Sequence, residues 1–167
     1  MFELKPITAS GIGAALEKAE RYRLLNDPVA AESICLDVLE IQPDNQEALV
    51  SLLLARTDQF ATSHGAGDAA AREVLPRLSS EYDRAYYTGL IAERRGKTLL
   101  HAVRPGSQGM AWQCFRDAMD SYESAIGLRP DGNDEAVLRW NTCARILNAH
   151  SHLAPDDVSI VTPVLDD

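Results

Sequence analysis

The chain has 167 residues, of which 46% are hydrophobic and 25% are charged, so it can bury a sizeable core and is not an intrinsically disordered polymer. Its net charge of −9 disfavours duplex nucleic acid and anionic membranes. Two interpretations of the charge stay open: a bias toward a partner with a basic surface, or a charge that only keeps the protein soluble. No segment approaches the roughly 18 apolar residues that cross a bilayer, and the first residues lack a signal-peptide pattern, so we expect a cytoplasmic protein.

The first two helices are separated by an Asn-Asp-Pro turn. The first is predicted by residues that recur at a spacing of three and four, namely Leu16, Ala19, Tyr22 and Arg23. Thr8 and Ser10 are its candidate N-caps, because their hydroxyls can accept hydrogen bonds from free backbone amides. Asp27 is the candidate N-cap of a second helix, which starts with Pro28 and stops before Pro43.

The later helices are predicted in the same way. A helix restarts after Asn45, and Ser80 followed by Asp83 marks the start of another. The other helical stretches cover about 68–76, 115–129 and 133–150. No alternating, strand-like pattern occurs before the tail, so the sequence predicts an all-α protein.

The three cysteines carry no metal or redox motif. Cys35, Cys114 and Cys143 are far apart, and no pair has the CxxC spacing. Each falls at an apolar position of a helical pattern. We therefore expect reduced thiols that pack as small hydrophobic side chains.

Two of the predicted helices carry the same spacing of small and large residues. The matched positions are Ala31, Cys35, Val38 and Pro43 in one helix and Ala118, Tyr122, Ala125 and Pro130 in the other. This pattern resembles the second half of a tetratricopeptide repeat, in which small residues let two helices approach closely and a proline ends the unit. Ahead of the first match, Ala19 and Tyr22 lie where that family has a small and a large residue.

The resemblance implies an all-α array of about three antiparallel helix hairpins and a C-terminal capping helix. One domain over residues 1–150 then contains repeats at about 12–45, 46–80 and 81–132, with the capping helix at 133–150. The residues expected at close-packing positions are Ala19, Tyr22, Ala31, Gly89, Ala118, Tyr122 and Ala125.

The third repeat departs from the family pattern through an insertion at residues 97–113. Helical spacing continues through Leu99 and Leu100, and residues 104–109 have the composition of a turn. Two alternatives stay open. The insertion either lengthens both helices of the third hairpin or forms an ordinary loop from Gly96, where glycine costs a helix about 1 kcal/mol relative to alanine.

The tail at 151–167 is acidic and is predicted to be extended or disordered. Pro155 and Pro163 prevent a regular helix, and the apolar residues between them alternate as in an extended segment. The tail and the third hairpin are the two places where we expect any contact between copies of the chain.

In the tetratricopeptide family the first helices of the hairpins line a concave groove that binds an extended peptide or a partner helix. By that resemblance, the groove residues here are Leu16, Glu20, Arg23, Val50, Leu54, Thr57, Tyr86, Leu90, Glu93, Arg94 and Arg145. The lysine and asparagine set with which some members hold a C-terminal carboxylate is not at these positions. The resemblance therefore implies a scaffold or adaptor that binds another protein or a peptide and that is not an enzyme and uses no cofactor or metal.

Three other interpretations stay open. His150 and His152 form a close histidine pair on which a metal-dependent or enzymatic role could rest, although zinc sites have three or four ligands. A self-assembling structural protein is the second interpretation. Within the binding class, the short acidic chain is also similar to the tetratricopeptide chaperones of type III secretion.

Overall fold

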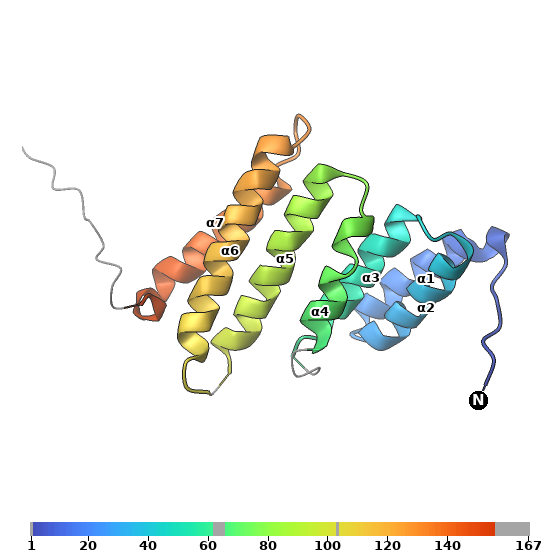
Figure 1. Cartoon of the computed structure of the whole chain (residues 1–167), viewed down its shortest axis with the longest axis horizontal. Helices are drawn as coiled ribbons and strands as arrows, with labels where there is room; N and C mark the ends of the chain where they lie inside the picture. Colours follow the sequence, from blue (N-terminus) through green and yellow to red (C-terminus); the bar gives the residue numbers. More distant parts are fainter. Residues whose placement is uncertain (1, 62–65, 103, 156–167) are drawn as a thin grey trace, which may run out of the picture.

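The computed structural model describes residues 2–61, 66–102 and 104–155, and every regular element in these ranges is helical. The α-helices (Figure 1) are α1 Ile12–Leu24, α2 Pro28–Ile41, α3 Gln46–Asp58, α4 Ala66–Arg72, α5 Glu81–Leu100, α6 Ser107–Leu128 and α7 Glu135–Ala149. Short 3-10 helices lie at Ala9–Gly11, Leu75–Arg77 and Ser151–Leu153. The all-α class predicted from the sequence is confirmed.

Consecutive helices pack as antiparallel pairs, and the pairs follow chain order along the long axis of the molecule (Figure 1). The α1–α2 pair forms one end, and α7 packs on α6 as a single helix at the other end. No helix in the described ranges combines the length and the apolar composition needed to cross a membrane. The predicted order of hairpins is therefore present, whereas membership of the tetratricopeptide family stays a proposal.

Side-chain caps fix where three of the helices begin. Asp27, Asn45 and Ser80 each accept a hydrogen bond of 2.9–3.1 Å from the backbone amide three residues later. Such a cap contributes about 1 kcal/mol to helix stability. Pro28 directly follows the first cap, where its missing N–H has no partner to lose. The predicted starts at Asp27 and Ser80 are confirmed.

The predicted caps of the first helix are wrong. Gly11, which has no side chain, occupies the N-cap position of α1. Thr8 precedes the 3-10 turn Ala9–Gly11 and Ser10 lies within it, and their hydroxyl oxygens lie 3.3 Å from each other. Because this extra turn precedes α1, neither hydroxyl caps the helix.

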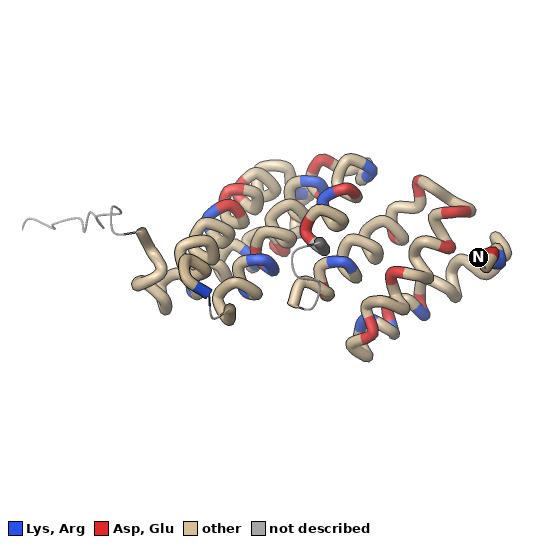
Figure 2. The backbone as a smooth tube through the Cα atoms, turned by 60° about the horizontal axis from the view of Figure 1, so that its bottom comes forward, with Lys and Arg blue, Asp and Glu red and all other residues tan. Residues whose placement is uncertain are grey.

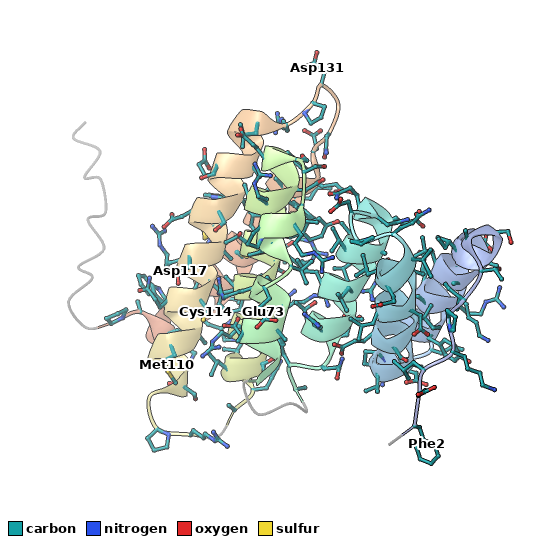
Figure 3. All side chains as sticks on the ribbon, turned by 45° about the vertical axis from the view of Figure 1, so that its right-hand side comes forward. Phe2, Glu73, Met110, Cys114, Asp117 and Asp131 are labelled. Carbon is teal, nitrogen blue, oxygen red and sulfur yellow. The ribbon has the colours of Figure 1, made fainter. Side chains whose placement is uncertain are left out.

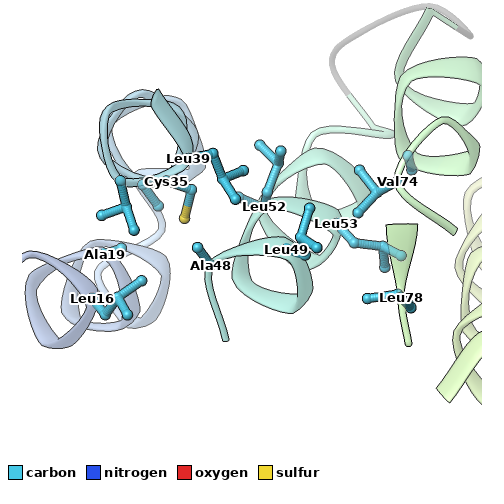
Figure 4. Close-up of a cluster of buried hydrophobic side chains, with 14 of the residues drawn as sticks. Leu16, Ala19, Cys35, Leu39, Ala48, Leu49, Leu52, Leu53, Val74 and Leu78 are labelled. Carbon is cyan, nitrogen blue, oxygen red and sulfur yellow. The ribbon is translucent and has the colours of Figure 1, made fainter. Parts of the chain in front are cut away.

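Buried apolar side chains form two clusters. The first joins α1 to α4, and Figure 4 shows ten of its members labelled: Leu16, Ala19, Cys35, Leu39, Ala48, Leu49, Leu52, Leu53, Val74 and Leu78. The second joins α5, α6 and α7 through residues that include Tyr86, Phe115, Ala118, Tyr122 and Cys143. Ile91 of α5 belongs to the first cluster, so α5 links the two.

Gly89 allows α5 and α6 to approach closely. A Cβ atom at this position would lie 2.8 Å from two ring carbons of Tyr122 and 3.1 Å from the carbonyl oxygen of Ala118. The remaining expected packing residues are fully buried, except for the partly exposed Tyr22: Ala19, Ala31, Ala118, Tyr122 and Ala125. Small residues therefore stand where the helices cross.

The residues that the family resemblance treats as an insertion lie largely in α5 and α6. α5 continues through Gly96 to Leu100, and α6 restarts at Ser107. A Cβ at Gly96 would lie 3.2 Å from the ring of Phe115, so the glycine lets the two helices pack closely at this point. The alternative of a loop starting at Gly96 is wrong. Met110, near the start of α6, stays half exposed on the outer side of the hairpin (Figure 3).

The regular helix ends before the tail. After Ala149 the chain forms the 3-10 turn Ser151–Leu153, and the side chain of Leu153 is buried. The prediction that the tail does not continue α7 is confirmed for this first part. The prediction of an extended or disordered tail otherwise concerns residues 156–167, which lie outside the described ranges.

Candidate functional site

Side chains from α1, α3 and α5 meet in one hydrogen-bonded cluster, which we call the charged strip: Arg23, Thr57, Asp58 and Arg94. The Nε of Arg23 donates to Oδ2 of Asp58 at 2.8 Å. The Nη1 of Arg94 donates to Oδ1 of Asp58 and, at 2.7 Å, to Oγ1 of Thr57. One carboxylate on α3 therefore connects α1 to α5.

The position of Asp58 explains why it needs two cationic partners. It is the last residue of α3, at the end of the helix where the backbone dipole disfavours a negative charge. Two guanidinium groups offset that unfavourable position. Sequence reasoning missed Asp58, although an acidic residue at the C-terminal end of a helix is itself a signal that a cation lies nearby.

The charged strip is partly open to solvent. The side chains of Arg23, Asp58 and Arg94 keep 19%, 24% and 24% of their exposure, while Thr57 is buried. Ion pairs at such positions contribute about 1 kcal/mol or less each. Each guanidinium has five N–H donors, more than the strip uses, so donors remain for a ligand. The strip is therefore an ordered set of hydrogen-bond donors at the surface.

A second charge cluster joins α5, α6 and α7 around one buried carboxylate. The carboxylate of Glu93 is fully buried and accepts hydrogen bonds from Lys97 Nζ at 2.5 Å and from Arg139 Nη1 at 3.3 Å. Its other oxygen accepts from the Tyr122 hydroxyl at 2.6 Å. Because both oxygens are hydrogen-bonded and two cations neutralise the charge, this cluster holds three helices together and offers no open site.

Burial and the charge of Glu93 raise the pKa values of two neighbouring side chains, Cys143 and Tyr122. Burial raises the pKa of the Cys143 thiol to about 12, and the negative charge of Glu93 adds to the effect. Burial and the same carboxylate raise the pKa of Tyr122 far above its ordinary value. Both groups are therefore neutral at physiological pH, and neither provides a nucleophile.

Five of the predicted groove residues are buried: Leu16, Thr57, Tyr86, Leu90 and Glu93. Leu16 belongs to the first core cluster. Tyr86 belongs to the second, where its ring lies 5.8 Å, centroid to centroid, from both Tyr82 and Tyr122. The neighbouring helices cover these side chains, and their predicted place in a ligand groove stays a prediction.

The other predicted groove residues keep some exposure. Arg23, Val50, Leu54 and Arg94 are partly exposed, and Glu20 and Arg145 are exposed. The structure brings Arg23 and Arg94 together in the charged strip, with Leu54 one turn before Asp58 on α3. Arg145 lies on α7, at the opposite end of the array from α1 (Figure 1).

The histidine pair gains no further ligand. The rings of His150 and His152 lie 5.9 Å apart, and Nδ1 of His150 is 2.9 Å from the Ile146 carbonyl oxygen. Among the described residues, no group of three or more histidine, cysteine, aspartate or glutamate side chains is placed to hold a metal ion.

The fold and the charged strip define an all-α protein built from sequential antiparallel helix pairs. No family model matches the sequence, and no curated protein or solved structure is significantly similar to it.

Proposed function

We propose that the chain is a tetratricopeptide-like, non-enzymatic binding module that takes a peptide or a helix of another protein along the face that carries the charged strip. The single observation that supports this proposal is the strip itself. Side chains from three successive odd-numbered helices, α1, α3 and α5, converge on Asp58 and stay partly exposed.

The chemistry of the strip suits a polypeptide ligand. Arg23 and Arg94 share one carboxylate, so the strip is locally cationic in a protein of net charge −9. Their remaining N–H groups can donate to backbone carbonyls or to an acidic side chain of a partner. Val50 and Leu54, partly exposed on α3, supply apolar contacts beside the donors. Mixed surfaces of this kind bind extended peptides and amphipathic helices.

Affinity capture from the native lysate tests the proposal. The double variant Glu20→Lys/Arg23→Gln alters the strip and its exposed neighbour on α1, whereas Asp120→Lys changes an exposed charge on α6. We expect the wild type and Asp120→Lys to retain the same proteins and the double variant to lose them. Circular dichroism confirms that each variant stays folded. A bound set that is the same for all three proteins, including no bound protein at all, contradicts the proposal.

A further inference from the structure

Exposed apolar side chains are concentrated at the N-terminal end of the array. Nine large apolar residues are exposed in the described ranges, and six of them lie between the N-terminus and the end of α2: Phe2, Leu4, Leu24, Leu25, Val29 and Leu36. Leu24, Leu25 and Val29, at the turn between α1 and α2, keep 81%, 69% and 65% of their exposure. Leu25 also lines a hollow on the surface of α1. Exposed apolar side chains beside such a hollow are a reason to look for an association site at this end of the array.

The outer side of the α1–α2 hairpin is hollowed. Two adjoining hollows of about 420 Å³ each share Lys18 and Tyr22. One continues along α1 to Leu25, and the other runs between α1 and α2 to Ile34. We call this surface the end face. The side chains that line it include Glu17, Lys18, Arg21, Tyr22, Ile34 and Asp37.

The end face is the uncovered end of a stack. Within the array, α3 packs against α1 and α2 and covers their inner side. The chain's own N-terminal segment does not cover the outer side. Ile7 lines one hollow, but Phe2 and Leu4 are almost fully exposed, and Figure 3 shows Phe2 pointing away from the helices. Stacked helical arrays require a polar terminal face to remain separate, whereas this face combines partly exposed apolar side chains, Tyr22 and Ile34, with charged ones.

The charges of the end face complement one another. Glu17 and Asp37 are acidic, and Lys18 and Arg21 are basic, so the face is locally balanced in a chain of net charge −9. Figure 2 shows acidic and basic residues interspersed at this end of the array. In the described part of the chain none of the four forms an ion pair, although Lys18 lies 5.7 Å from the centre of the Tyr22 ring.

This balance favours a second copy of the same chain. Two copies of an acidic protein repel each other over most of their surfaces. At the end face each copy instead offers both signs of charge, none of them paired internally, around an apolar centre. A strongly acidic or strongly basic partner would leave half of these charges facing their own sign.

We propose that the end face is the interface of a homodimer in which the two copies are related by a two-fold axis. In such an interface each copy uses the same patch, so every contact between two different residues occurs twice. Lys18 on α1 of one copy then faces Asp37 on α2 of the other, and Tyr22 and Ile34 of both copies are covered. The charged strip lies on the side of α1 that faces α3, so the dimer is independent of the proposed function.

Sedimentation equilibrium of the full chain over a concentration series tests the proposal. We expect the wild type to reach twice the chain mass of 18.3 kDa. In a dimer of Lys18→Glu, each introduced glutamate faces Asp37 of the other copy. In a dimer of Asp37→Lys, each introduced lysine faces Lys18 of the other copy. Each variant alone therefore has a dimer Kd at least about tenfold higher than the wild type. An equimolar mixture of the two variants restores the dimer, because every contact in the mixed dimer again joins an acidic to a basic side chain.

Asp120→Lys on α6 is the matched control, since it makes the same change of charge as Asp37→Lys at an exposed position away from the end face. This variant dimerises like the wild type. A wild-type protein that is monomeric at about 100 µM, well above the Kd of a micromolar interface, overturns the proposal and leaves the end face to a helix of a different protein. Dimerisation that neither variant weakens, or that the mixture does not restore, overturns the assignment to this face.

Discussion

The hydroxyl of Tyr122 on α6 donates a 2.6 Å hydrogen bond to the fully buried carboxylate of Glu93 on α5. Gly89 lies one turn before Glu93 on α5, and a Cβ atom added there would lie 2.8 Å from the Tyr122 ring. A buried carboxylate is tolerated only when its oxygens are hydrogen-bonded, so the tyrosine is part of what allows a charge in the core.

Replacing Tyr122 with phenylalanine removes that hydrogen bond and leaves one Glu93 oxygen without its donor. We expect Tyr122→Phe to lower the free energy of unfolding by roughly 1.5–3 kcal/mol, the range for hydrogen bonds to charged groups. Urea unfolding followed by circular dichroism measures the change. Tyr82→Phe is the control, because the Tyr82 hydroxyl makes a longer, part-buried bond of 3.3 Å to Asn133. Equal losses for the two variants would contradict the role assigned to Tyr122.

Two glycine-to-alanine substitutions are expected to change the free energy of unfolding in opposite directions. Gly89→Ala places a Cβ 2.8 Å from the Tyr122 ring, so overpacking lowers the free energy of unfolding by roughly 1–3 kcal/mol. Gly127→Ala, near the end of α6, meets no atom within 4 Å and raises it by up to about 1 kcal/mol through helix propensity. Thermal melts of both variants decide the matter. A neutral Gly89→Ala would mean that the two helices can separate at low cost.

Local signals in the sequence predicted the helix starts well. Asp27 and Ser80 cap their helices because an N-cap depends only on residues a few positions away. The pattern of small residues likewise identified Gly89 and Ala118 as buried positions. The failure at Thr8 was also local, since a 3-10 turn entered ahead of α1 and displaced the cap to Gly11.

The candidate site was harder to predict, because exposure depends on where distant helices lie. Glu93 resembles a surface residue in sequence, yet Arg139 on α7 and Tyr122 on α6 enclose it. Asp58 belongs to the charged strip only because Arg23 and Arg94 reach it from α1 and α5. No spacing rule within one helix contains that information. The register between hairpins decides which charges are paired and which stay open.

Buried thiols are expected to make the protein sensitive to alkaline pH. Burial raises the pKa of Cys35 to about 11 and that of Cys143 to about 12, from an ordinary value of 9.0. The folded state therefore holds these protons more tightly than the unfolded state does. The stabilisation is complete below pH 9. It is lost as the pH rises from 9 toward 11 for Cys35 and toward 12 for Cys143, by up to about 1.4 kcal/mol per pH unit for each thiol.

Urea unfolding at pH 8, 9 and 10 measures this loss before the tyrosines contribute strongly. The double variant Cys35→Ala/Cys143→Ala is less stable at every pH because it leaves cavities, but its stability falls less steeply between pH 9 and 10. The comparison uses the slope and not the absolute stability. Identical slopes for the variant and the wild type would show that the two thiols are not the groups responsible.

Reversing the charge of Arg145 tests how far the binding face extends along the array. Arg145 is exposed on α7, and the tetratricopeptide resemblance places it in the groove. Arg145→Glu is expected to leave the melting temperature nearly unchanged, because exposed substitutions alter stability by about 0.5 kcal/mol or less. The amount of captured partner protein should decrease, and this decrease should be smaller at about 1 M salt, where charges are screened beyond about 3 Å.

Arg116→Glu on α6 makes the same charge change at an exposed site of another helix and should not affect capture. If both variants reduce capture equally, the effect reflects net charge; if Arg145→Glu reduces nothing, the binding face ends before α7.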